Sequence, residues 1–442
     1  MLKRNTLVLA LVALALVAGV LLYDRVAPPT SEQPTAAVAL SPAEVTQIQV
    51  NQVQLQRQGS QWQIQSPLQV LADINTVNDL LRTASELKPL ATLEGISNFQ
   101  EFGLDPARTT VTLTLADGSQ RTIRVGSPTF DRSAAYARVG DGEVLTIAVT
   151  DEYALTPDLL RLRDRQLLRF EPGEVTEISL RGKGRTPAIR VKRNDGQWLV
   201  NGNLLGDDRR IEAWLDTLQT ATASDFVSEE KGDPNQLKTY SLNQPDLSLT
   251  LTADRPLTLQ LAKNALEELH AVSSDQPGIM SVPLRLLSDL AVTVNDLRFK
   301  HFTRFDSADL AEIQIQAQDA SLSRNLTPVP NSDQWIISDQ PDRQVLLTGL
   351  LDPLRTGEAI EFLPANKANS TLKQPQLTLK LIPRPDRDPQ PLTLAFAPDP
   401  RDPGRVYVRS TEQPDILVMP GAQYEELLAV IRALQPVETA QP

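Results

Sequence analysis

The chain has 442 residues, carries a net charge of −12 and contains no cysteine. Its length predicts about three domains, and its apolar share of 41% predicts globular folding. The lack of cysteine excludes disulfides, thiolate metal sites and thiol catalysis, and the acidic balance argues against a nucleic acid as partner.

The N-terminal residues have the pattern of a membrane signal. Lys3 and Arg4 precede an uncharged apolar run, Leu7 to Tyr23, which as a helix would span about 25 Å, the short end of a membrane crossing. The alternative is a cleaved signal peptide, with Ala37-Val38-Ala39 as the cleavage site. Because no such site follows the apolar run directly, we favour an uncleaved anchor over 1–23. Its basic end would lie in the cytoplasm and the bulk of the chain in the periplasm.

A Gln-Trp pair recurs three times at an almost constant spacing. The tryptophans, each with the apolar residue two positions later, are Trp62 with Ile64, Trp198 with Val200 and Trp335 with Ile337. Side chains at i and i+2 share one face of a strand, so each pair predicts a buried face. Tryptophan also stacks on sugars, but an apolar pairing repeated three times favours packing in the core of a repeated module.

The segments around the tryptophans repeat as well. Each copy is predicted to contain, in order, a first hairpin ending in the tryptophan strand, a helix (77–87, 211–218, 345–354), a second hairpin (from 102–115, 240–253, 370–383), a last strand (144–149, 278–283, 415–420) and a short Leu-rich helix. We therefore predict an α+β fold. It would consist of one N-terminal transmembrane helix followed by three tandem repeats of an antiparallel-sheet-plus-two-helix module.

The predicted boundaries follow from this repeat. They are 1–23 for the cytoplasmic tip and transmembrane signal anchor, 24–42 for a Pro/Ala-rich stalk, 43–170, 171–305 and 306–436 for the three modules, the last divergent, and 437–442 for a tail. Phe170 and Phe305 stand in similar joins and are predicted to pack into the seams between modules. Short joins predict modules stacked in a row with limited hinge freedom.

Two stretches of the first module carry a family resemblance. QWQIQSPLQVLADINTVNDLLRTASEL (61–87) and FGLDPARTTVTLTLADG (102–118) resemble an uncharacterised bacterial family, domain-of-unknown-function family 4340. The resemblance covers nearly all of 1–305, whereas in the third module Ser370 and Thr371 replace the family's aromatic-Gly pair. It implies a setting like that of accessory envelope proteins found beside ABC-2 type exporters and gliding-motility systems, and it implies no catalytic residues.

Residues that could carry chemistry stand alone. His270 and His301 lack a second ligand at helical metal spacing and are predicted to be surface or turn histidines. Ser228 and Lys231 fit a bare Ser-x-x-Lys pattern without its companion motifs, which favours a solvated loop. The run 181–185, Arg-Gly-Lys-Gly-Arg, lacks the spacing of a phosphate loop and indicates a hairpin turn.

Three charged segments admit a structural interpretation. The run 207–210, Asp-Asp-Arg-Arg, is either an acid pair with basic partners or, as we favour, a set of charges in the first turn of a helix. The proline-rich segments 383–391 and 397–405 do not space their acids around a glycine as a calcium loop does, so we predict stiff loops. No catalytic, cofactor-binding or metal-binding residue is predicted.

The sequence thus predicts a non-enzymatic, single-pass protein of the bacterial inner membrane that serves as an accessory or scaffold, and the family resemblance implies an envelope ABC transporter as the system that it serves. The expected partners are the inner membrane, through the N-terminal helix, and other envelope or transporter proteins. A periplasmic binding module for glycan, peptide or lipid is the main alternative. An envelope hydrolase is the third.

Overall fold

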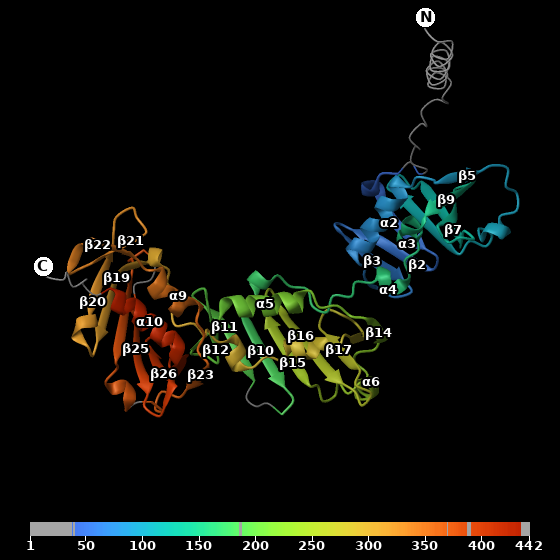
Figure 1. Ribbon diagram of the computed structural model, residues 1–442. Coiled ribbons are helices and arrows are strands. Elements are labelled where there is room, and N and C mark those ends of the chain that lie inside the picture. Colours follow the sequence, from blue (N-terminus) through green and yellow to red (C-terminus); the bar gives the residue numbers. More distant parts are fainter. Residues whose placement is uncertain (1–37, 39, 185–187, 369, 387–389, 435–442) are drawn as a thin grey trace, which may run out of the picture. The chain divides into compact units, whose positions relative to one another are not determined.

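The computed structural model describes residue 38 and residues 40–184, 188–368, 370–386 and 390–434 (Figure 1). The chain divides into two compact units, Met1–Arg165 and Gln166–Pro442. The first unit holds the first module, and the second unit holds the other two. The predicted membrane anchor, most of the stalk and the tail lie outside the described residues. Within the described part, no helix is long and apolar enough to cross a membrane.

The first module contains nine strands and three helices. The strands are β1 (Val45–Val50), β2 (Val53–Gln58), β3 (Gln61–Ser66), β4 (Val70–Leu71), β5 (Ala91–Leu93), β6 (Thr109–Leu115), β7 (Gln120–Pro128), β8 (Ala134–Val139) and β9 (Val144–Ala148), and the helices are α2 (Ile74–Glu86), α3 (Val149–Leu155) and α4 (Leu159–Leu162). The strands form one antiparallel sheet in the order β4-β3-β2-β1-β6-β7-β8-β9-β5. Two four-stranded meanders therefore meet at β1 and β6, and β5 is added at the far edge.

The second module repeats this sheet strand for strand. Its strands are β10 (Glu177–Gly182), β11 (Ile189–Asn194), β12 (Gln197–Val200), β13 (Leu204–Leu205), β14 (Asp225–Ser228), β15 (Leu247–Thr252), β16 (Pro256–Lys263), β17 (Leu269–Ser273) and β18 (Ile279–Val282), and its helices are α5 (Asp208–Gln219), α6 (Pro234–Thr239), α7 (Arg285–Leu290) and α8 (Val294–Leu297).

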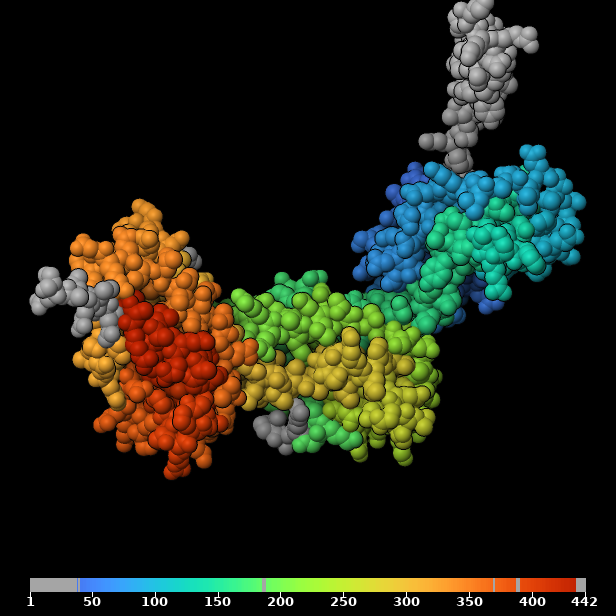
Figure 2. Space-filling view, viewed as in Figure 1, coloured from blue at the N-terminus to red at the C-terminus, as the bar shows by residue number. Residues whose placement is uncertain are grey.

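The third module has the same strand order with fewer described helices. Its strands are β19 (Leu310–Ala317), β20 (Arg324–Pro328), β21 (Gln334–Ile337), β22 (Gln340–Leu346), β23 (Glu361–Leu363), β24 (Leu377–Pro383), β25 (Leu392–Asp399), β26 (Asp402–Ser410) and β27 (Ile416–Pro420), and its helices are α9 (Thr348–Thr356) and α10 (Gly421–Ala433). Short 3-10 turns η1 (Pro42–Glu44), η3 (Pro172–Glu174) and η4 (Ser307–Asp309) precede the opening strands of the three modules. In Figure 2, α10 is the red surface of this module.

The tandem three-fold repeat is confirmed, but the predicted fold class is wrong. The molecule is mostly β, because each module is built from a nine-stranded sheet, and the longest described helices, α2 and α10, have only 13 residues. The prediction missed the third strand of the second meander (β8, β17 and β26) and the short strands at the sheet edges. It also placed Val345 and Leu346 in a helix, whereas they end β22.

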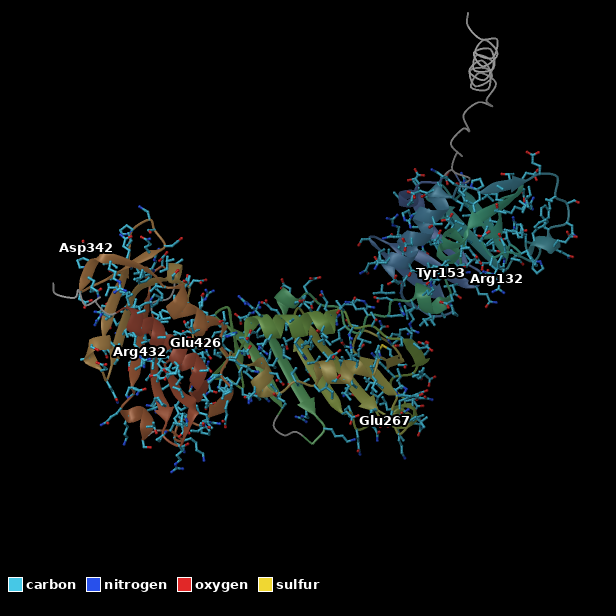
Figure 3. All side chains as sticks on the ribbon, in the orientation of Figure 1. Arg132, Tyr153, Glu267, Asp342, Glu426 and Arg432 are labelled. Atoms are coloured by element: carbon cyan, nitrogen blue, oxygen red, sulfur yellow. The ribbon has the colours of Figure 1, made fainter. Side chains whose placement is uncertain are left out.

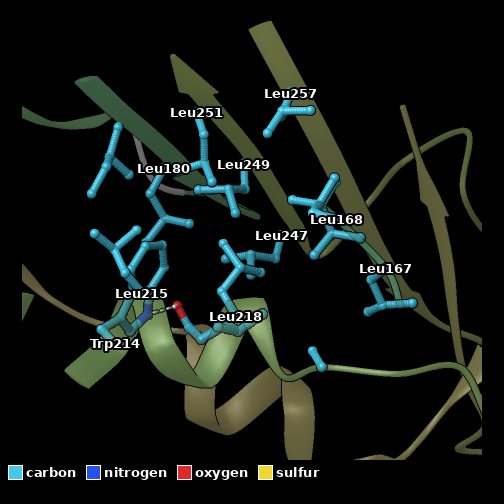
Figure 4. Close-up of a cluster of buried hydrophobic side chains, with 14 of the residues drawn as sticks. Leu167, Leu168, Leu180, Trp214, Leu215, Leu218, Leu247, Leu249, Leu251 and Leu257 are labelled. Atoms are coloured by element: carbon cyan, nitrogen blue, oxygen red, sulfur yellow. Dashed lines mark hydrogen bonds between the residues drawn. The ribbon is translucent and has the colours of Figure 1, made fainter. Parts of the chain in front are cut away.

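The strand tryptophans lie in the cores, as predicted. Trp62, Trp198 and Trp335 are 3%, 0% and 2% exposed. In the second module, α5 turns Leu215 and Leu218 toward leucines of β10 and β15 (Figure 4). Trp214 joins that cluster, and its indole N–H donates to the carbonyl of Leu290 at 3.4 Å.

The join phenylalanines belong to single modules. Phe170 packs in the core of the second module and Phe305 in the core of the third. The prediction that they fill seams between modules is therefore wrong. Each phenylalanine instead secures the start of the module that it introduces.

Candidate functional site

The two modules of the second unit hold their incoming chain in the same way. The loop before the last strand carries the sequence acid-Gln-Pro, at 275–277 and again at 412–414. The amide of Gln276 donates to the carbonyl of Gln166 at 2.8 Å, and the amide of Gln413 donates to the carbonyl of Phe299 at 3.1 Å. The sequence analysis missed this clamp, although the repeated Gln-Pro pair was a visible signal.

The acids of these loops bind the arginines of the joins. The carboxylate of Asp275 accepts from the backbone amide of Arg169 at 2.7 Å and from both Nη atoms of Arg255 at 2.9 and 3.0 Å. In the third module, Arg304 pairs with Glu412 at 3.4 Å. Burial alone would raise the pKa of Asp275, but these hydrogen bonds outweigh burial and hold that pKa below its usual range.

A buried arginine connects the second module to the third. Arg298, directly after α8, has a side chain that is 3% exposed and pairs with Asp415 at 2.8 Å. Its guanidinium carbon lies 3.7 Å from the ring centroid of Phe362. Burial lowers the pKa of Arg298, and the hydrogen bond and charge of Asp415 oppose that shift. A paired and stacked charge of this kind fixes the geometry of the junction.

Backbone hydrogen bonds hold the linker from both sides. Toward the second module, the amide of Phe299 donates to the carbonyl of Leu205 at 2.9 Å. Toward the third, the amide of Phe302 donates to the carbonyl of Leu354, also at 2.9 Å. The second and third modules are therefore held together by their linker as well as by side chains.

This junction forms a partly open cavity of about 300 Å³. Leu205 and Phe299 form its apolar part. Arg209, His301 and Arg355 bring cationic or ionisable nitrogens to it. Asp207, Asp208, Gln197 and Arg304 also line it. The cavity thus combines an apolar wall with a set of hydrogen-bond donors, the composition usual for small-molecule sites.

Some of these polar groups have a structural role at the junction. Asp207 caps α5, because its carboxylate accepts from the amide of Arg210 at 3.2 Å and pairs with the guanidinium of Arg210 at 3.3 Å. The interpretation of 207–210 as first-turn charges is thereby confirmed. The amide of Gln197 faces the guanidinium of Arg304, where its oxygen is the acceptor.

Two further cavity residues, His301 and Arg355, have partners in the third module. Nδ1 of His301 lies 3.0 Å from the carbonyl of Gly357. A carbonyl only accepts, so Nδ1 carries the proton, and Nε2 is an acceptor in the neutral ring and a donor only in the imidazolium. Arg355 pairs with Asp306 at 2.5 Å and with Asp352 at 4.0 Å, in both cases through Nη1. A ligand bound by Arg355 would have to use the other donors of its fork, Nη2 and Nε.

One prediction about an isolated residue is wrong, and another is confirmed for the backbone. His270 is not a surface histidine but a buried one on β17, 3% exposed, and burial lowers its pKa, against a smaller opposing effect of Glu268. Lys231 does lie in an exposed turn after β14, as predicted, but its half-buried ammonium donates to the carbonyls of Ser273 and Gln276 at 2.8 and 2.6 Å. Lys231 thereby connects the turn after β14 to the loop between β17 and β18, whereas Nδ1 of His270 is buried without a hydrogen-bond partner among the described residues.

The remaining predicted segments lie at hairpin ends. The run 181–185 begins with the last two residues of β10 and continues into the connection to β11, and 397–405 spans the turn between β25 and β26 rather than a free loop. Parts of 181–185 and 383–391 lie outside the described residues. In the part of the chain that the structure describes, no group of three or more acidic, histidine or cysteine side chains could hold a metal ion.

Comparison with known proteins identifies a family for this chain. The family model described as "Domain of unknown function (DUF4340)" matches residues 62–204 and again residues 198–375. The two matches begin at Trp62 and Trp198, and the second extends into the third module. No curated protein and no solved structure matches the chain. Since the matches together span more than half of the 442 residues, the chain belongs to the DUF4340 family of proteins with a domain of unknown function.

Proposed function

We propose that this protein is a non-enzymatic accessory or scaffold protein of the bacterial envelope, held at the inner membrane by its apolar N-terminal segment. On this proposal the modules lie in the periplasm and bind partner proteins, with the subunits of an envelope ABC transporter as the leading candidates. The apolar run after Lys3 and Arg4 supports the location.

The observation that carries the proposal is the junction of the second and third modules. The buried ion pair of Arg298 with Asp415 and the clamp made by Gln413 hold two repeats as one body. A rigid pair of repeats presents a preorganised surface, and preorganisation reduces the ordering cost of binding a partner. A glycan-binding role based on the strand tryptophans loses its support, because those side chains lie inside the cores.

Exposed apolar side chains mark where partners would bind. Phe130 is 106% exposed at the turn after β7, and Tyr153, labelled in Figure 3, is 64% exposed on α3. In the second unit, Leu266 and Ile360 are 77% and 59% exposed. These positions tolerate a photoreactive amino acid, because their side chains have little packing to lose.

The test is photocrosslinking in intact cells with the full chain carrying a photoreactive residue at one of these four positions. Adducts with an exporter permease or its ATPase at one or more exposed positions, and none when the label replaces the buried Leu249, are the expected result. A chain that forms no adduct with any envelope protein from all four positions contradicts the scaffold role.

A further inference from the structure

The three modules provide an internal control for the cavity at the junction. A residue that recurs at equivalent positions serves the fold, whereas one that appears at this junction alone needs another explanation. The capping aspartates Asp73 and Asp207 recur, and so do the join arginines Arg169 and Arg304. These four residues therefore belong to the repeat rather than to a site.

Three cavity residues do not recur, and the positions that correspond to them at the preceding join carry neutral amides. Two positions after the capping aspartate, the first module has Asn75 where the second has Arg209. The isolated β-bridges Ala72–Arg163 and Gly206–Arg298 occupy equivalent places in the first and second modules. Three residues after these two arginines stand Gln166 and His301, which therefore correspond to each other.

The third replacement lies at the end of a helix. Thr220 and Thr356 end equivalent helices, and the hydroxyl of each donates to the carbonyl four residues earlier. The residue before this threonine is Gln219 in the second module and Arg355 in the third. Two arginines and a histidine thus replace three amides around one cavity.

A fourth replacement removes a negative charge from the same place. The residue after the bridging arginine is Asp164 in the first module and Phe299 at the junction. Phe299 forms part of the apolar wall, with His301 edge-to-face against its ring at 5.5 Å between centroids. Only Asp208, in place of Ile74, adds a negative charge. In a protein of net charge −12, these replacements add two arginines and a histidine to one small cavity that Asp207 and Asp208 also line.

We propose that the cavity binds a small organic acid: a carboxylate held by Arg209, Arg355 and the imidazolium form of His301, attached to an apolar or aromatic body that packs on Phe299 and Leu205. Arginine presents a planar fork that matches a carboxylate in two parallel hydrogen bonds. Asp207 and Asp208 lie close by and would repel a dianionic phosphate more strongly than a single carboxylate. The binding site does not depend on the scaffold role, which is tested through different residues.

The test is calorimetric titration of the full chain with N-acetyl-phenylalanine, its uncharged amide and inorganic phosphate. We expect the acid to bind at least tenfold more tightly than the amide or phosphate. The variant Arg209→Asn, His301→Gln, Arg355→Gln installs the residues found at the equivalent positions, so it should fold, and we expect it to lose at least tenfold in affinity for the acid.

The matched control is Arg285→Gln, which removes an exposed arginine of α7 that pairs with Asp289 outside the cavity. It should bind the acid as the unaltered chain does. The proposal is overturned if the acid binds no better than the amide or phosphate, if the triple variant keeps full affinity, or if the acid binds more weakly than about 1 mM.

Discussion

At the scale of single residues, burial separates the aromatic side chains into two groups with different roles. Trp62 is 3% exposed and belongs to the core cluster of the first module. Phe130 in the same unit is fully exposed. A large side chain contributes to stability in proportion to the apolar area that folding removes from water, so the two residues should respond oppositely to truncation.

Trp62→Ala should therefore lower the free energy of unfolding of the first module by about 3–5 kcal/mol, since it removes a large buried side chain and leaves a cavity. Phe130→Ala is the control and should change it by less than about 0.5 kcal/mol. Guanidinium denaturation followed by circular dichroism measures both. If Trp62→Ala unfolds at the same denaturant concentration as the unaltered chain, the tryptophan is not a core residue.

At the scale of elements, the loop between β17 and β18 determines how the chain enters the second module. Asp275 links three segments, because it accepts from Arg169 in the join, from Arg255 between β15 and β16, and from Ser274 in its own loop. Its side chain is only 2% exposed. Hydrogen bonds to a charged, buried carboxylate are among the stronger polar contributions to stability.

Asp275→Asn should destabilise the second module by roughly 2 kcal/mol at pH 7. The folded-state pKa of Asp275 is lowered, so its contribution is complete above the unfolded value of about 3.9 and is lost as the pH falls through the folded value. The difference in the free energy of unfolding between the variant and the unaltered chain should shrink as the pH falls from about 5 toward about 2. Urea unfolding followed by tryptophan fluorescence measures it.

The control for this experiment is Glu267→Gln, which removes the exposed pair of Lys263 with Glu267, the acid labelled in Figure 3. Glu267→Gln should change the free energy of unfolding by less than about 1 kcal/mol at every pH. If Asp275→Asn destabilises the module equally at pH 7 and pH 3, the negative charge of Asp275 does not contribute to the stability of the loop.

At the scale of the whole molecule, the described chain is two compact units, and the second contains two modules. Arg298 belongs to the end of the second module, while Asp415 and Phe362 belong to the third. Removing one partner of a buried pair leaves an uncompensated charge and costs more than the pair contributes. Arg298 is therefore the residue on which the union of these modules depends most directly.

Arg298→Gln should destabilise the junction by about 3 kcal/mol, and the two modules of the second unit should then unfold in separate transitions rather than one. Differential scanning calorimetry of the full chain measures the number of transitions. Arg285→Gln is again the control and should leave the calorimetric profile unchanged. One unaltered transition of the second unit in Arg298→Gln would show that the modules are held together by other contacts.

The sequence by itself determined the repeat, because the positions of Trp62, Trp198 and Trp335, the alternation of β6, β15 and β24, and the helix-starting aspartates are local patterns that chain geometry imposes. It also determined the family, since the motifs that define it are contiguous. It did not determine the mostly β architecture, because strands of two to four residues such as β4, β5, β13 and β14 are too short to show a period and form only beside a partner strand.

Only the tertiary structure decided the junction and its cavity. Arg209, His301 and Arg355 are far apart in the chain, and nothing in their local sequence distinguishes them from the charged side chains that cover any surface. They meet because α5, the linker and α9 converge where the second module joins the third. The burial of His270 and the carbonyl contacts of Lys231 were likewise beyond the sequence, because burial and long-range hydrogen bonds depend on which distant segments fold against a residue.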